Sequence, residues 1–205
     1  ARDGIATLGA GWERALGSFG FWAEAAYTAS KVDDPPLFPS LLTALASEFG
    51  GDYFRTSVGL DRALSDNTLA MIEYHHSSFG IDDPQQYQNL LLTRGFQQGG
   101  IYLVGKDYLV PSISWTATPL LNLSASAFVN LTDTSAFVRA SGDYSLSENL
   151  YTDFGVHFGL GDATRYETVT ISLPSFPPFP YPQLVQGSEF GSFPTTAYIS
   201  LRYYF

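Results

Sequence analysis

TTAYISLRYYF, residues 195–205, has an apolar residue at every second position. A β-strand projects successive side chains to opposite faces, so this spacing predicts a strand with one apolar and one more polar face. The apolar face would hold Ala197, Ile199, Leu201, Tyr203 and Phe205. The same period recurs in LNLSASAFVNL, residues 121–131. What covers the apolar face therefore decides the fold.

The composition excludes several classes of protein and of functional site. The 205 residues carry a formal net charge of −10, include no cysteine and are 16% aromatic. Without cysteine there is no disulfide, thiolate metal site or thiol catalysis, and an acidic chain without a basic stripe is not expected to bind nucleic acid. The sequence contains no run of about 18 apolar residues, so no transmembrane helix is predicted. Many short alternating runs in an aromatic, glycine-rich chain are typical of an all-β barrel.

Nine segments follow the alternating pattern and are predicted to be strands. Each has about the length that crosses a bilayer as a tilted strand, roughly 9–11 residues. The predicted strands are residues 4–16, 20–30, 52–64, 68–79, 101–116, 121–131, 135–146, 150–160 and 195–205. We interpret residues 1–205 as a single domain.

The connections between these segments alternate between two classes. Four are tight turns with the sequences LGSFG, LSDNT, TPLLN and LSENL, in which Gly, Asn, Asp, Ser or Pro supplies the turn geometry. Between them lie residues 31–51, 80–100, 132–134 and 161–194, three of which are long. Tight turns at one end and long outer loops at the other are the topology of a bacterial outer-membrane barrel.

Period-two patterning alone does not distinguish this barrel from a soluble β-sandwich or jelly roll, because the two expose opposite faces. Two features favour lipid. The polar faces carry mostly small uncharged residues with single charges, where a soluble sheet carries more Lys and Glu. Aromatic residues also gather near strand ends, as in the interfacial girdles of a barrel. They are Trp12, Phe19, Phe21, Tyr27, Tyr74, Trp115, Tyr144, Phe158, Tyr203 and Phe205.

The last segment resembles the C-terminal strand of the porin-like superfamily of Gram-negative outer-membrane β-barrels. Ile199, Leu201, Tyr203 and Phe205 match its alternating apolar residues and final Phe. The resemblance implies an antiparallel transmembrane β-barrel in the bacterial outer membrane, with this strand as the signal for the barrel-assembly machinery. It also implies outer-membrane lipid and lipopolysaccharide as partners, with other envelope proteins or further copies of the chain as alternatives, and no cofactor.

The strand count conflicts with a complete barrel of this kind. Single-chain bacterial barrels have an even number of strands, whereas nine are predicted. Either one strand escapes the pattern, giving about ten, or the sequence is the C-terminal part of a larger barrel. We favour the second expectation slightly.

Charged and histidine residues on the polar faces are the candidates for lining the barrel lumen. In a wide barrel they would line an aqueous path and set ion preference, and in a narrow one they would pair into a structural polar network. The candidates are Glu13, Glu24, Arg55, Asp61, Glu73, His75, Lys106, Arg139, Asp143, Asp153, His157 and Arg202. No metal site is predicted, since adjacent His75 and His76 would face opposite sides of a strand.

The last long loop holds the sequence SFPPFPYPQL, residues 175–184, and is expected to be extended. It would either fold into the lumen as a constriction or contact a partner chain. The residues concerned are Phe176, Pro177, Pro178, Phe179 and Tyr181.

These features predict a channel for passive diffusion of small solutes or ions, and not an enzyme. The alternative is a closed structural barrel that serves as an envelope anchor, an adhesin or a subunit of an outer-membrane assembly. A third hypothesis is a hydrolase at the outer rim, using Ser77, His75 and Asp82, although no nucleophile motif frames any serine.

Overall fold

The computed structural model describes residues 5–30, 52–87, 90, 102–171 and 178–205. The described part of the chain is all-β and antiparallel, and it includes a short 3₁₀ helix, η1 (Pro84–Gln86). The strands are β1 (Ile5–Leu16), β2 (Phe19–Ser30), β3 (Tyr53–Ser65), β4 (Thr68–Ser77), β5 (Asp107–Thr118), β6 (Leu121–Asn130), β7 (Ala136–Ser147), β8 (Leu150–Leu160), β9 (Arg165–Ile171), β10 (Phe179–Val185) and β11 (Thr196–Tyr203). Among the described residues, no helix is long and apolar enough to cross a membrane.

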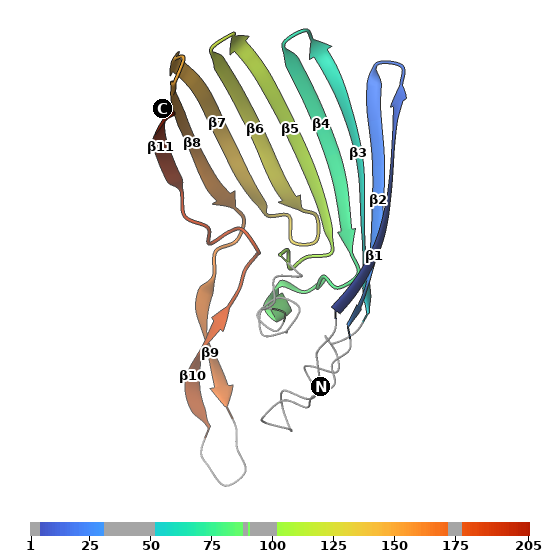
Figure 1. The fold of residues 1–205 in the computed structure, drawn as a ribbon. Coiled ribbons are helices and arrows are strands. Elements are labelled where there is room, and N and C mark those ends of the chain that lie inside the picture. Colours follow the sequence, from blue (N-terminus) through green and yellow to red (C-terminus); the bar gives the residue numbers. More distant parts are fainter. Residues whose placement is uncertain (1–4, 31–51, 88–89, 91–101, 172–177) are drawn as a thin grey trace.

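Nine of the strands form one sheet in the order β1-β2-β3-β4-β5-β6-β7-β8-β11 (Figure 1). Strands β9 and β10 pair with each other and form a hairpin that extends beyond one end of the sheet. In the part of the chain that the structure describes, β1 pairs only with β2, and β11 only with β8. The sheet is therefore open, and the predicted closed barrel is not formed by the described residues alone.

The two ends of the sheet differ as predicted. Pairs β1–β2, β3–β4, β5–β6 and β7–β8 are joined by two-residue turns at one end, here called the turn end. The first turn contains Gly17, whose φ of 65° lies in the left-handed region that glycine adopts without strain. Strands β2, β4, β6 and β8 end at the opposite end of the sheet, here called the loop end (Figure 1). Because all neighbours are antiparallel, β1 and β11 both run from the loop end to the turn end.

The nine predicted segments correspond to the nine strands of the sheet, with two differences. The prediction began one strand at residue 101, whereas β5 begins at Asp107 because residues 102–106 pack into the loop-end core described below. Residues 161–194 were predicted to be a loop, which is wrong in part because they include the β9–β10 hairpin. Residues 31–51 lie outside the described residues, as does much of 80–100.

The register divides the sheet into a polar face and an apolar face. On β6, Ala125 lies opposite Ala140 of β7, and the next residue, Ser126, lies opposite Arg139. The same alternation continues through every pair from β1 to β11. Large side chains on the apolar face are exposed from one side of the sheet to the other, from Leu8 (79%) to Ile199 (80%).

The main hydrophobic cluster lies at the loop end and on the polar-face side of the sheet. It contains Tyr53, Ile81, Tyr87, Leu90 and Val104, with Phe79 packed against it. The register places Tyr53 on the same face as Arg55, two residues along β3. The described loop residues therefore pack onto the polar face, and no described segment forms a layer over the apolar face.

Candidate functional site

The structure brings together nearly all predicted lumen residues on the polar face. The register places these residues on that face: Glu13, Glu24, Arg55, Asp61, Glu73, His75, Arg139, Asp143, Asp153, His157 and Arg202. Lys106 is the exception, because it precedes β5 and forms an ion pair with Asp82 in the loop-end region. The polar face is the candidate functional site.

One group of charges, here called the acidic patch, spans β1 to β4. Glu13, Glu24, Asp61 and Glu73 lie there with a single guanidinium group, that of Arg55. Three of the carboxylates lie opposite glycines on a neighbouring strand: Glu24 opposite Gly11, Asp61 opposite Gly20 and Glu73 opposite Gly59. None of the four carboxylates forms an ion pair with another described residue.

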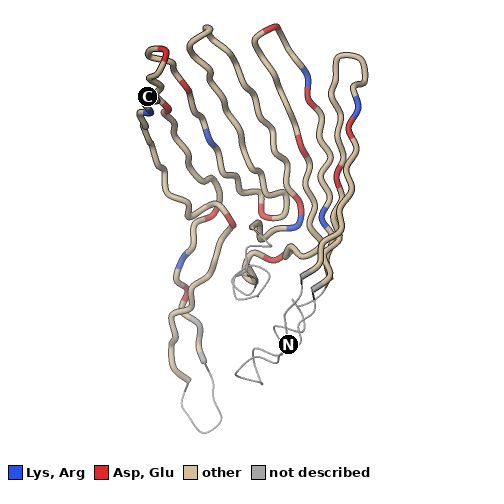
Figure 2. The backbone as a smooth tube through the Cα atoms, viewed as in Figure 1, with Lys and Arg blue, Asp and Glu red and all other residues tan. Residues whose placement is uncertain are grey.

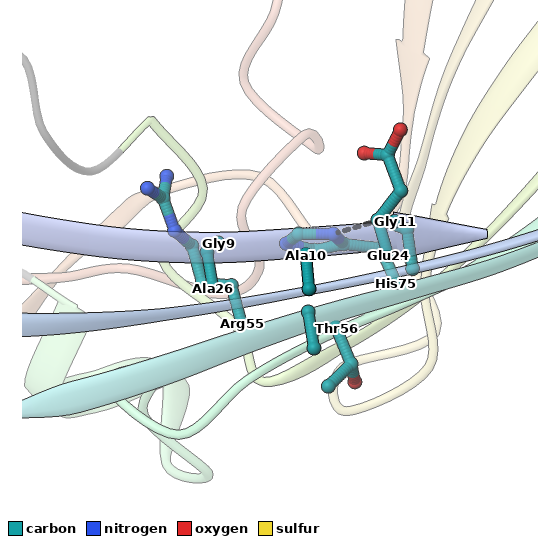
Figure 3. Close-up of a pocket in the computed structure, with 10 residues that line it drawn as sticks. Gly9, Ala10, Gly11, Glu24, Ala26, Arg55, Thr56 and His75 are labelled. Atoms are coloured by element: carbon teal, nitrogen blue, oxygen red, sulfur yellow. Dashed lines mark hydrogen bonds between the residues drawn. The ribbon is translucent and has the colours of Figure 1, made fainter.

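A pocket of about 360 Å³ lies beside this patch (Figure 3). Its lining includes Gly9 and Gly11 of β1, together with Glu24, Arg55 and His75. Figure 3 shows the Arg55 and Glu24 side chains rising from the same side of the sheet, with His75 between them. The small residues of β1 line the pocket beside the charged groups of β2 and β3.

His75, which lines this pocket, is also one of the three residues proposed for a hydrolase. His75 Nδ1 lies 2.9 Å from Ser57 Oγ on the neighbouring strand, whereas Ser77 is buried and Asp82 pairs with Lys106. A catalytic triad needs a carboxylate on the second ring nitrogen of the histidine, and the described residues give His75 no such hydrogen bond. Among the described residues, Ser77, His75 and Asp82 are therefore not brought together as a triad.

A second group of charges, here called the paired patch, spans β7, β8 and β11. Asp143 and Asp153 lie directly opposite each other, and Arg202 contacts both carboxylates. Its Nη2 lies 3.7 Å from Asp143 Oδ1 and closer to Asp153. Arg139 donates a hydrogen bond to the Tyr198 hydroxyl at 3.1 Å. The guanidinium groups balance the two carboxylates here.

Uncharged residues separate the two patches. The polar-face residues of β5 and β6 include Ser112, Ser114, Ser124 and Ser126, and Figure 2 shows no charge along the middle of these strands. Ser124 Oγ lies 2.9 Å from Ser141 Oγ across the next pair. The polar face is therefore a hydroxyl-rich surface with charges concentrated at its two sides.

Sequence reasoning missed a buried carboxylate at the loop end. Glu189 is 8% exposed and accepts hydrogen bonds from Val104 N at 3.1 Å, Tyr108 Oη at 2.5 Å and Asn130 Nδ2 at 2.8 Å. Its own backbone N–H donates to Asp133 Oδ2 at 2.7 Å. These contacts tie the segment before β11 to the segments around β5 and β6, and so hold the loops against the polar face.

The electrostatics of this loop-end network follow from burial. Loss of hydration raises the pKa of Glu189, although its three hydrogen bonds favour the ionised form. Burial likewise raises the pKa of Tyr87, whose hydroxyl accepts a hydrogen bond from Asn130 at 3.1 Å. The signal in the sequence was SEFG, residues 188–191, an acidic residue in an apolar and glycine-containing context.

The proline-rich segment does not behave as a simple extended loop. Phe176 and Pro177 lie outside the described residues, Pro178 is exposed, and Phe179 and Tyr181 belong to β10. The hairpin points away from the sheet in Figure 1, and Tyr181 remains exposed. Pro180 and Pro182 within β10 lack N–H donors, as is typical of an edge strand.

The apolar face carries the predicted aromatic and terminal-strand residues. Ile199 and Leu201 of β11 lie opposite Phe154 and Thr152 of β8, and Tyr203 lies opposite Leu150. The predicted girdle residues that fall within strands all share this face. The final residue, Phe205, follows β11 and is fully exposed.

Comparison with known proteins found no matching family model, no similar curated protein and no similar solved structure.

Proposed function

We propose that the sheet is part of the wall of an outer-membrane β-barrel that acts as a channel for passive diffusion of small solutes or ions. One observation carries the proposal. The apolar face exposes large side chains such as Leu8, Ile199 and Leu201 (65%), while the described loops pack onto the opposite, polar face. Soluble proteins rarely leave so continuous an apolar surface uncovered.

Hydrocarbon is the solvent that suits this arrangement. Fully burying a Leu or Ile side chain is worth about 1.5–3 kcal/mol, so a sheet-wide apolar face in water would be strongly unfavourable. A soluble sandwich would need a second layer on this face. The aromatic residues on the same face fit the interfacial zones of a bilayer, where Trp and Tyr are enriched.

In a barrel wall, the backbone N–H and C=O groups at both open edges of the sheet must also find hydrogen-bond partners. In lipid, each unpaired backbone N–H or C=O group costs several kcal/mol. Since β1 and β11 run in the same direction, closure with antiparallel neighbours alone needs an odd number of further strands between them. With an odd number added to nine, the total becomes even, as in bacterial barrels.

The channel proposal is tested by reconstitution and by labelling. Purified protein in planar bilayers is expected to give discrete conductance steps, and well-inserted but electrically silent protein would contradict a channel. Because the chain has no cysteine, Ser124→Cys and Ala125→Cys form a matched pair on β6. In vesicles, a water-soluble maleimide is expected to label position 124 and to spare position 125, and the opposite pattern would reject the barrel wall.

A second candidate function is an adhesin or a subunit of an envelope assembly. It is favoured by the β9–β10 hairpin, on which Tyr166 (77%) and Tyr181 are exposed beyond the loop end of the sheet. Deleting residues 172–184 is expected to abolish partner capture while leaving membrane insertion intact. Capture that survives the deletion would remove this candidate.

A further inference from the structure

The charges on the polar face are unequal in number. Counted over the strands of the sheet, six carboxylates and three guanidinium groups lie on this face, a formal charge of −3 with histidine neutral. The carboxylates are Glu13, Glu24, Asp61, Glu73, Asp143 and Asp153, and the guanidinium groups are Arg55, Arg139 and Arg202. The whole-chain charge of −10 includes loops and turns and does not bear on this balance.

The excess negative charge lies entirely in the acidic patch. In the paired patch, Arg202 contacts both Asp143 and Asp153, and Arg139 supplies the second positive charge. In the acidic patch, four carboxylates face one guanidinium group. The strands between the two patches carry uncharged hydroxyl groups on this face, and Figure 2 shows no charge along the middle of these strands.

The positions of the acidic residues make their fields overlap. Glu24 lies opposite Ser57, Asp61 opposite Gly20, and Glu73 opposite Gly59. These pairings place the carboxylates on three adjacent strands, and Glu73 is the diagonal neighbour of Asp61, a spacing of roughly 7–8 Å. Like charges held along one side of a low-dielectric wall focus the potential and raise the local concentration of counter-ions.

We infer that the channel prefers cations and that the acidic patch sets this preference. The inference rests on the proposed channel function and names the class of solute that the channel favours. Rings and rows of Asp and Glu give cation preference in pores by the same electrostatic attraction. The paired patch contributes little to the preference, because Arg202 contacts both of its carboxylates and Arg139 supplies a second positive charge nearby.

The test is the reversal potential of the reconstituted protein under a KCl gradient. Wild-type protein is expected to show K⁺ permeating several-fold more readily than Cl⁻, and more so at low salt, where screening is weaker. The triple variant Glu24→Gln, Asp61→Asn, Glu73→Gln removes the excess charge and is expected to lose the preference. The single variant Glu24→Gln is expected to shift it partially.

A matched control and two different negative outcomes distinguish failure of the channel function from failure of the cation preference. Asp66→Asn changes one charge in the β3–β4 turn and is expected to leave the reversal potential unchanged. Absence of any conductance would overturn the channel function and this inference with it. Conductance without cation preference, or a preference that survives in a folded triple variant, would overturn the inference while the channel stands. Circular dichroism in detergent verifies that the triple variant is folded.

Discussion

Trp22 of β2 lies across Gly59 of β3, so that a Cβ atom at residue 59 would overlap the indole ring. The ring covers the glycine backbone on the polar face, where a larger residue on β3 would displace it. This contact joins the strands that carry Glu24 and Asp61, two of the four carboxylates of the acidic patch. Its loss would therefore disturb both the stability of the sheet and the position of the carboxylates.

Replacing Gly59 is expected to destabilise the protein. Gly59→Ala inserts a methyl group into the space of the Trp22 ring, and overpacking of this kind costs about 1–3 kcal/mol. Urea unfolding in detergent micelles, followed by tryptophan fluorescence, measures the change. Gly9→Ala is the control, because its nearest contact would be an ordinary 3.4 Å from Ala25 O. Equal stability of the two variants would contradict the contact.

Charge introduced on the two faces of β6 is expected to have unequal costs. Ala125→Lys places an ammonium group on the apolar face; in the proposed barrel wall this face meets lipid, and a lysine at the bilayer midplane costs about 2–4 kcal/mol. Ser124→Lys places it on the polar face, among hydroxyl groups of Ser141 and Ser114. Unfolding of both variants from lipid vesicles checks the difference. A greater cost at residue 124 would show that the apolar face is the one enclosed by protein.

The Tyr108 hydroxyl is expected to be the central donor and acceptor of the loop-end network. It donates to Glu189 and accepts from Gly105 N at 2.6 Å. Tyr108→Phe leaves a buried N–H without its acceptor and a carboxylate without one donor, a loss of about 1–3 kcal/mol. Amide hydrogen exchange at Gly105 and Val104 is expected to accelerate. The control is Tyr102→Phe at an exposed position, and acceleration in both variants would argue against a specific network.

The loop end is expected to lose stability as the pH rises. Burial raises the pKa of Glu189 above its ordinary value of 4.5. A carboxyl group with a raised folded-state pKa contributes its full stability below the unfolded-state pKa and loses it as the pH rises through the folded-state value. Hydrogen exchange at Val104, measured from about pH 4 upward and corrected for intrinsic rates, is expected to show weakening protection.

Glu189→Gln is the variant that isolates this effect. Glutamine keeps the size of the side chain and stays uncharged, so the variant is expected to flatten the pH dependence of protection at Val104. A wild-type protein whose loop-end protection grows with pH would show that the hydrogen bonds to the carboxylate outweigh its loss of hydration.

Local periodicity was enough to predict the strands and their faces. The alternation in residues 121–131 and 195–205 depends only on strand geometry, and the register of β6 and β11 follows it. The eleven charged or histidine residues assigned to one face were predictable for the same reason. The tight turns were predictable because their residues determine backbone geometry locally.

Features that depend on distant contacts were not predicted. β5 begins later than predicted because Val104 N donates to Glu189, 85 residues away along the chain. The β9–β10 hairpin was missed because its prolines argue against a strand, whereas pairing with β9 leaves an edge on which they are tolerated. The division of charges into an acidic patch and a paired patch depends on which strands are neighbours, and alternation along one strand does not specify that.

The shared direction of β1 and β11 restricts how copies of this sheet could assemble. Rotation about an axis along the strands preserves every chain direction, so β11 of one copy would meet β1 of the next side by side and heading the same way. A ring made only of this sheet would thus contain a parallel seam at each junction. An uninterrupted antiparallel cylinder requires at least one strand of the opposite heading at every such junction.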